Sequence, residues 1–202
     1  MIGFPLFHGG SSHYRHLLEI GAPIRPWPHK DAALGLMREV WSELRARGRE
    51  PDELRRGMLE QRSGHANWQH GETYVTASLK AAAGYAASNG EHGGELLKEC
   101  AEALAILKRM DAEIARDLRT RYPALVPMLD GGGTPLLVRI EEVRVEDLQF
   151  EVRAGAAGGK SLEETVAEIA SVGNNPGVMA VLGMTGFRLR PGAGIVAAID
   201  DL

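Results

Sequence analysis

The segment from residue 71 to residue 86, GETYVTASLKAAAGYA, changes character in its middle. Its first half, TYVT, is β-branched and aromatic and has a strong preference for strand. Its second half is rich in alanine, which favours helix, and Ser78 stands where a helix N-cap belongs. The segment therefore predicts a strand that runs directly into a helix, with Tyr74 on the strand and Tyr85 on the helix.

The other helices are predicted from apolar residues spaced three and four apart and from residues that cap helix ends. They cover about 13–20 with Ser11 or Ser12 as the cap, about Asp31 to Gly48, Pro51 to about Gln61, 94–120 as one long helix, and 161–171 with Ser161 and Glu164 as a capping box.

Strands are predicted at 2–8, ending at His8, at 73–76, in PLLVRIEEVRV (135–145), in LQFEV (148–152), and in the short apolar runs of 177–199. This order of elements predicts one α+β domain over residues 1–202, with a helical insertion at about residues 31–70.

Composition argues against several classes of protein. A formal net charge of -4 over 202 residues disfavours broad electrostatic binding to nucleic acid or to an anionic membrane. One cysteine, Cys100, cannot form an internal disulfide or a cysteine-based zinc site, and it fits a reducing compartment. The start of the chain, MIGFPLFHGG, lacks the pattern of a signal peptide, and no apolar run reaches the roughly 20 residues of a membrane span. We therefore expect a cytoplasmic protein with no membrane partner.

The histidines invite a comparison with metal sites. His13 and His16 are three residues apart on a predicted helix and so share a face, and His65 and His70 lie in one loop. A metal site needs three or four convergent ligands, and the carboxylates do not cluster near these histidines. We expect no metal.

The segment AGAAGGKS, residues 154–161, fits a relaxed phosphate-binding loop between a predicted strand and a predicted helix. Only about 40 residues follow Lys160, too few for the further parallel strands and the acidic residue that such a nucleotide-binding fold needs. A glycine-rich turn beside a helix cap is the simpler interpretation, and contact of this loop with ligand phosphates stays open.

Two motifs together resemble the NAD-binding signature of the ADP-ribosyltransferases of the diphtheria toxin and poly(ADP-ribose) polymerase type. These are LFHGG at 6–10 and GETYVTASLKAAAGYA at 71–86, about a tenth of the chain. Members of the family carry a His-Gly step at the end of a first strand. They also carry a Gly-x-Tyr strand that runs into a small-residue helix ending in a second tyrosine. The matching residues here are His8, Gly9, Tyr74, Ala82, Ala83 and Tyr85.

The resemblance implies a fold of split antiparallel β-sheets and an NAD-dependent mono-ADP-ribosyltransferase. NAD would be the co-substrate, with nicotinamide between Tyr74 and Tyr85 and a ribose on His8. An aromatic face can stack on the flat, cationic nicotinamide ring, and Gly9 would let the backbone approach the ligand. Ser78 could contact the ligand as well as cap its helix.

The sequence departs from the family at the catalytic acid. Many members place a glutamate on a late strand, where it stabilises the oxocarbenium-like transition state, but the corresponding segment GMTGFRLRPG (183–192) has no carboxylate. The rifampin ADP-ribosyltransferases, which the chain also resembles, carry an acid soon after the strand that follows the helix. By position this would be Glu146 or Asp147, and we favour Asp147.

Two further questions stay open at this point. The chain could instead be an inactive domain of this fold that acts as a binding or regulatory module. If it is a transferase, the acceptor could be a protein, a nucleic acid or a small molecule.

Overall fold

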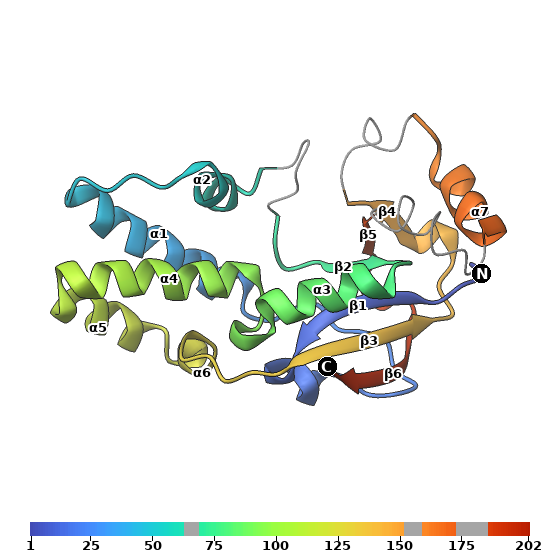
Figure 1. Cartoon of the computed structure of the whole chain (residues 1–202), viewed down its shortest axis with the longest axis horizontal. Coiled ribbons are helices and arrows are strands. Elements are labelled where there is room, and N and C mark those ends of the chain that lie inside the picture. The colour runs from blue at the N-terminus through green and yellow to red at the C-terminus, as the bar shows by residue number, and fades with distance from the viewer. Residues whose placement is uncertain (63–68, 152–158, 173–185) are drawn as a thin grey trace.

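The computed structural model describes residues 1–62, 69–151, 159–172 and 186–202. Their strands form one six-stranded sheet in the order β4-β5-β2-β1-β3-β6, and every neighbouring pair is antiparallel (Figure 1). The strands are β1 (Leu6–Ser11), β2 (Thr73–Thr76), β3 (Pro135–Glu141), β4 (Leu148–Phe150), β5 (Gly186–Leu189) and β6 (Ile195–Asp201). The predicted α+β class is confirmed.

The sheet has a narrow joint in its middle, between β1 and β2. The pairing of β1 with β3 runs from Leu6 to Ser11, whereas its pairing with β2 is the single pair Phe7 and Thr76. Two groups of three strands, β4-β5-β2 and β1-β3-β6, therefore meet at one residue pair. The split sheets that the resemblance implies are joined here into one.

The first strand begins and ends later than predicted. His8 lies inside β1 rather than at its end, because Gly9 and Gly10 continue the pairing with β3. Gly9 is required here by the helix α3 (Leu79–Asn89): a Cβ atom on Gly9 would lie 2.2 Å from the carbonyl oxygen of Ala82. The missing side chain lets α3 lie directly on β1.

The remaining helices lie mostly to one side of the sheet (Figure 1). They are α1 (Lys30–Ala46), α2 (Glu53–Glu60), α4 (Glu95–Met110), α5 (Ala112–Arg121) and α6 (Val126–Leu129), with α7 (Leu162–Val172) beside β4 and short 3-10 turns at Ser12–Leu17, Gly90–His92, Pro123–Leu125 and Val145–Asp147. In the described part of the chain, none of these helices has the length and apolar character needed to cross a membrane.

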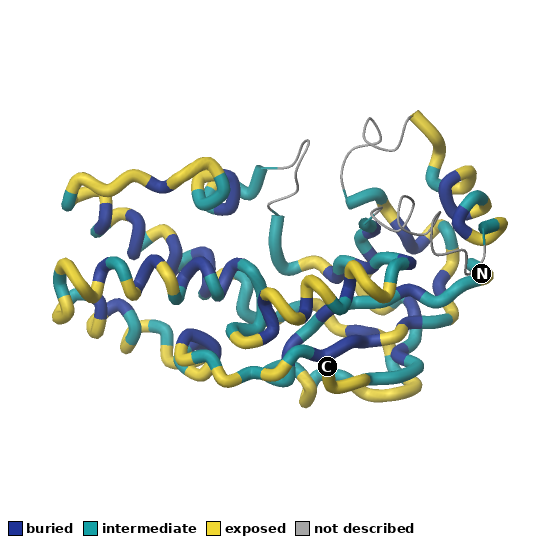
Figure 2. Tube along the Cα trace, viewed as in Figure 1, coloured by how far each residue is buried: buried dark blue, intermediate teal, exposed yellow. Residues whose placement is uncertain are grey.

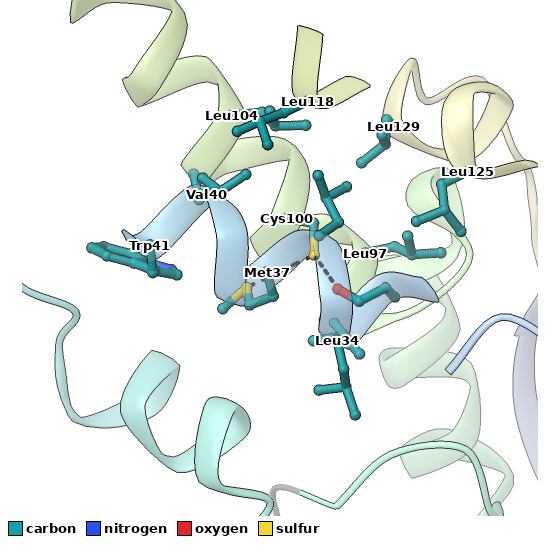
Figure 3. Packing of buried hydrophobic residues seen from close by; sticks show 14 of the residues in the cluster. Leu34, Met37, Val40, Trp41, Leu97, Cys100, Leu104, Leu118, Leu125 and Leu129 are labelled. Carbon is teal, nitrogen blue, oxygen red and sulfur yellow. Dashed lines mark hydrogen bonds between the residues drawn. The ribbon is translucent and has the colours of Figure 1, made fainter. Parts of the chain in front are cut away.

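Two hydrophobic cores result. One is built from the helices α1, α2, α4, α5 and α6, whose facing sides are buried (Figure 2). The Cys100 thiol lies fully inside this core and donates to the Ala33 carbonyl oxygen at 3.5 Å, with Met37 beside it (Figure 3). The second core lies between the sheet and α7 and includes Leu6, Phe187 and Ile169. The helices predicted as an insertion thus share a core with α4 and α5.

Three predicted helix starts are confirmed in atomic detail. The Ser78 side chain accepts a hydrogen bond from the Ala81 N–H at 3.2 Å. Ser161 and Glu164 form the reciprocal capping box, with N–H to side-chain distances of 3.1 and 2.7 Å. Ser11 caps the first 3-10 turn.

Two helix boundaries differ from the prediction. The predicted long helix over 94–120 is broken at Asp111, which ends α4 in an extended conformation and caps α5 by accepting from the Ile114 N–H at 3.1 Å. The Asp111 carboxylate also pairs with Arg47 at 2.8 Å. A short carboxylate competes well for free backbone N–H groups, which favours a cap over a helix interior. For the same reason Asp52, rather than Pro51, starts α2.

Candidate functional site

A cavity of about 310 Å³ lies where β1, β2, α3 and the first turn of α4 meet. His8, Gly9, Tyr74 and Tyr85 all line it, so the two sequence motifs come together in space. The segment between β1 and α1 supplies a more apolar part of the wall with Leu17, Leu18, Ile24 and Trp27.

His8 is fixed by the strand opposite. Its Nδ1 atom lies 2.8 Å from the carbonyl oxygen of Tyr74. A carbonyl oxygen only accepts hydrogen bonds, so Nδ1 carries the proton and Nε2 is left as an acceptor. Burial lowers the pKa of His8, which keeps the ring neutral near pH 7. Such a ring can accept a hydrogen bond from a hydroxyl group of a ligand.

Tyr74 is fixed by hydrogen bonds at both its backbone and its side chain. Its backbone carbonyl receives the His8 hydrogen bond, and its hydroxyl donates to the carbonyl oxygen of Gln69 at 3.0 Å. Its ring is therefore oriented before any ligand arrives.

Tyr85 lies on α3 and offers an exposed ring. The residue is 45 % exposed although α3 packs against β1. Its hydroxyl is nevertheless surrounded by protein, and this desolvation, followed by the Glu95 carboxylate, raises the pKa of Tyr85 to about 12. Glu151 and Tyr74 add to that shift, and all four residues line the cavity.

Two predicted site residues do not line the cavity. Ser78 acts as the N-cap of α3, as described above. Asp147 is 8 % exposed and binds Arg144 through both carboxylate oxygens, at 2.9 and 3.2 Å. The hydrogen bonds from Arg144 lower the pKa of Asp147. Its neighbour Glu146 is exposed and lies 3.5 Å from Arg144. The structure thus gives Asp147 a structural ion pair away from the cavity.

One of the acids that line the cavity is Glu151, which the sequence did not single out. It follows β4 directly, and its N–H donates to the Gly186 carbonyl at 2.9 Å. Its carboxylate lies against Gly186, where an added Cβ would come within 1.7 Å of Oε2. Glu151 lines the cavity and influences the ionisation of both Tyr85 and Glu95. The only sequence signal for it is the single carboxylate in LQFEV, four residues beyond Asp147.

Glu72 and Glu95 also line the cavity. Glu72 pairs with Arg188 on β5 at 3.2 Å. Glu95 stands at the start of α4, and burial, then the neighbouring Glu99, raise its pKa.

The other motifs of the sequence do not form a site in the described residues. No group of three or more His, Cys, Asp or Glu side chains that could hold a metal occurs within these ranges. His13 lies 3.1 Å from the Glu91 carbonyl oxygen, and His65 falls outside the described residues. Most of the glycine-rich segment 154–161 also falls outside them, and Lys160 at its end pairs with Glu168 of α7 at 2.6 Å.

Comparisons with protein-family models, with curated proteins and with solved structures find no match to this chain.

Proposed function

We propose that this chain is an NAD-dependent mono-ADP-ribosyltransferase, which breaks the bond between nicotinamide and ribose and transfers ADP-ribose to an acceptor. One observation carries the proposal. The two motifs that resemble the family line a single cavity and are joined by the hydrogen bond between His8 and Tyr74, which are 66 residues apart.

Four of the lining residues have a chemical task in this proposal. The exposed ring of Tyr85 and the fixed ring of Tyr74 flank the cationic nicotinamide, a contact worth about 0.5–2 kcal/mol. The neutral His8 ring accepts a hydrogen bond from a ribose hydroxyl through Nε2. Glu151 takes the role first assigned to Asp147: its negative charge stabilises the positive charge that develops on the ribose as nicotinamide leaves.

Mono-transfer is the simpler activity, because chain elongation needs a second site for an ADP-ribose acceptor. The lone, buried Cys100 fits a reducing cytoplasm.

A second candidate function follows from the residues of β5. The described strand Gly186–Leu189 carries no carboxylate, although the late strand of many family members does. If Glu151 does not replace it, the domain would bind NAD or a partner without catalysis.

The test is release of nicotinamide from NAD+ by the purified chain and by Tyr74→Ala, followed by chromatography. The proposal expects measurable turnover by the wild type and a large loss in the variant. Turnover that survives unchanged in Tyr74→Ala would remove the stacking role, and absence of turnover with retained NAD+ binding would favour the inactive module.

A further inference from the structure

A tight turn at two glycines positions Glu95 at the cavity. Gly93 and Gly94, with φ of 80° and 134°, adopt conformations that residues with a side chain avoid. The Gly94 N–H donates back to the Asn89 carbonyl at 3.0 Å, so that α4 starts directly beside the end of α3. A Cβ on Gly93 would lie 2.7 Å from the Tyr14 hydroxyl, which leaves no room for another residue there. The turn thereby sets the first side chain of α4, Glu95, in the cavity wall.

Glu95, Tyr85 and Glu151 all line this cavity. After desolvation by burial, the Glu95 carboxylate is the next largest cause of the raised pKa of Tyr85. Glu151 in turn raises the pKa of Glu95. Besides Glu72, which pairs with Arg188, the cavity is lined by two carboxylates from different elements, Glu151 after β4 and Glu95 at the start of α4.

The surroundings of Glu95 make it a better base than an ordinary glutamate. Burial and the adjacent Glu99 raise its pKa, and Glu151 adds to them. Lys98, one turn along α4, opposes this, but its ammonium group donates to the Ser88 carbonyl at 3.3 Å. A general base works best when its pKa is moved toward the working pH, and two carboxylates with different surroundings can take different roles.

We propose that Glu95 is the general base that deprotonates the acceptor, an inference that rests on the proposed function. The bond between ribose C1′ and the nicotinamide nitrogen breaks, and its electron pair leaves with neutral nicotinamide. The acceptor's O–H oxygen forms the new bond to C1′, and its proton passes to the Glu95 carboxylate and then to solvent. Glu151 stabilises the ribose charge while Glu95 removes the proton, so the acceptor class is a neutral hydroxyl nucleophile, with water as its simplest member.

A carboxylate in the first turn of a helix also stabilises that helix, and the experiment has to separate the two roles. NAD+ hydrolysis is measured with water as the acceptor for wild type, Glu95→Gln, Glu95→Asp, Glu151→Gln and Glu113→Gln. Glu113 is the matched control because it is an exposed glutamate in the first turn of α5, away from the cavity. Each variant is repeated with sodium azide, an anionic nucleophile that has no proton to lose.

The proposal predicts that Glu95→Gln lowers hydrolysis about 10²-fold or more, the usual size of a general-base effect. Azide should restore nicotinamide release in Glu95→Gln and give ADP-ribosyl azide, but should not restore Glu151→Gln. Glu95→Asp should keep more activity than Glu95→Gln, and Glu113→Gln should match the wild type.

Two results would overturn the inference alone: hydrolysis by Glu95→Gln within twofold of an active wild type, or a loss that azide does not restore. A wild type with no NAD+ turnover would overturn the proposed function, and this inference with it.

Discussion

The Nδ1 atom of His8 donates to the carbonyl oxygen of Tyr74 over 2.8 Å, across the narrowest joint of the sheet. The two strands on either side share only the pair Phe7 and Thr76. The side-chain bond therefore supplements the backbone pairing at the point where the cavity opens. The joint of the sheet and the candidate ligand site are the same place.

Replacing His8 should separate its role in holding the sheet together from its role in binding the ligand. His8→Asn keeps an N–H that can donate to the Tyr74 carbonyl but removes the acceptor nitrogen, whereas His8→Ala removes both. We expect His8→Ala to lower the free energy of unfolding by about 1–3 kcal/mol, because the partly buried Tyr74 carbonyl loses its side-chain partner. His8→Asn should lose much less stability and yet lose NAD+ binding. Urea denaturation and ligand titration check the pair, and equal stability loss in both variants would contradict this division.

Gly9→Ala should destabilise the fold through the clash with the Ala82 carbonyl. We expect a loss of about 1–3 kcal/mol, since an inserted methyl group must push α3 away from β1. The control is Gly3→Ala, where no atom lies within 4 Å of the added methyl, and its effect should stay within about 0.5 kcal/mol. Similar denaturation midpoints for the two variants would argue against close packing at Gly9.

Glu151 and Asp147 should behave differently on neutralisation. Glu151→Gln is expected to slow nicotinamide release by about 10²–10³-fold, as loss of a transition-state charge partner does. Asp147→Asn breaks the pair with Arg144, so it should lower stability and leave turnover of the folded protein unchanged. Steady-state assays with melting curves test both, and the reverse pattern would restore Asp147 as the acid.

His70 should make the protein sensitive to acid. Burial, and then the charge of Lys30, lower its pKa to about 4 from an ordinary value of 6.5. Between these values the unfolded chain binds more protons than the folded one, so stability falls as the pH falls through 6.5 toward 4. The His70 ring alone is expected to lower the free energy of unfolding by about 2 kcal/mol between pH 7 and pH 5. Denaturation of wild type and His70→Gln at both pH values measures it, and an equal pH dependence in the two proteins would contradict the assignment.

Local features of this chain were predictable from sequence because their causes are local. Ser78, with an alanine-rich segment after it, is enough to specify the start of α3, and Ser161 with Glu164 specifies α7. The break at Asp111 was hidden because apolar residues continue at helical spacing on both sides of it, from Leu107 to Ile114.

Features that depend on distant contacts were not predictable. Gly9 and Gly10 look like a strand end, and only the pairing with β3 shows that β1 continues through them. Glu151 reaches the cavity because β4 pairs with β5, and its carboxylate then lies against Gly186. By contrast, His8, Tyr74 and Tyr85 were named from their motifs, and the structure places all three at one cavity.

The most direct measurement of the central claim is thermal unfolding of wild type and His8→Ala with and without NAD+. Ligand at ten times its dissociation constant adds about 1.4 kcal/mol to the unfolding free energy, which for a chain of this size raises the Tm by roughly 3–6 °C. We predict this rise for the wild type and none for His8→Ala. An unchanged wild-type Tm at millimolar NAD+, or an equal rise in both proteins, would contradict an NAD site built on His8.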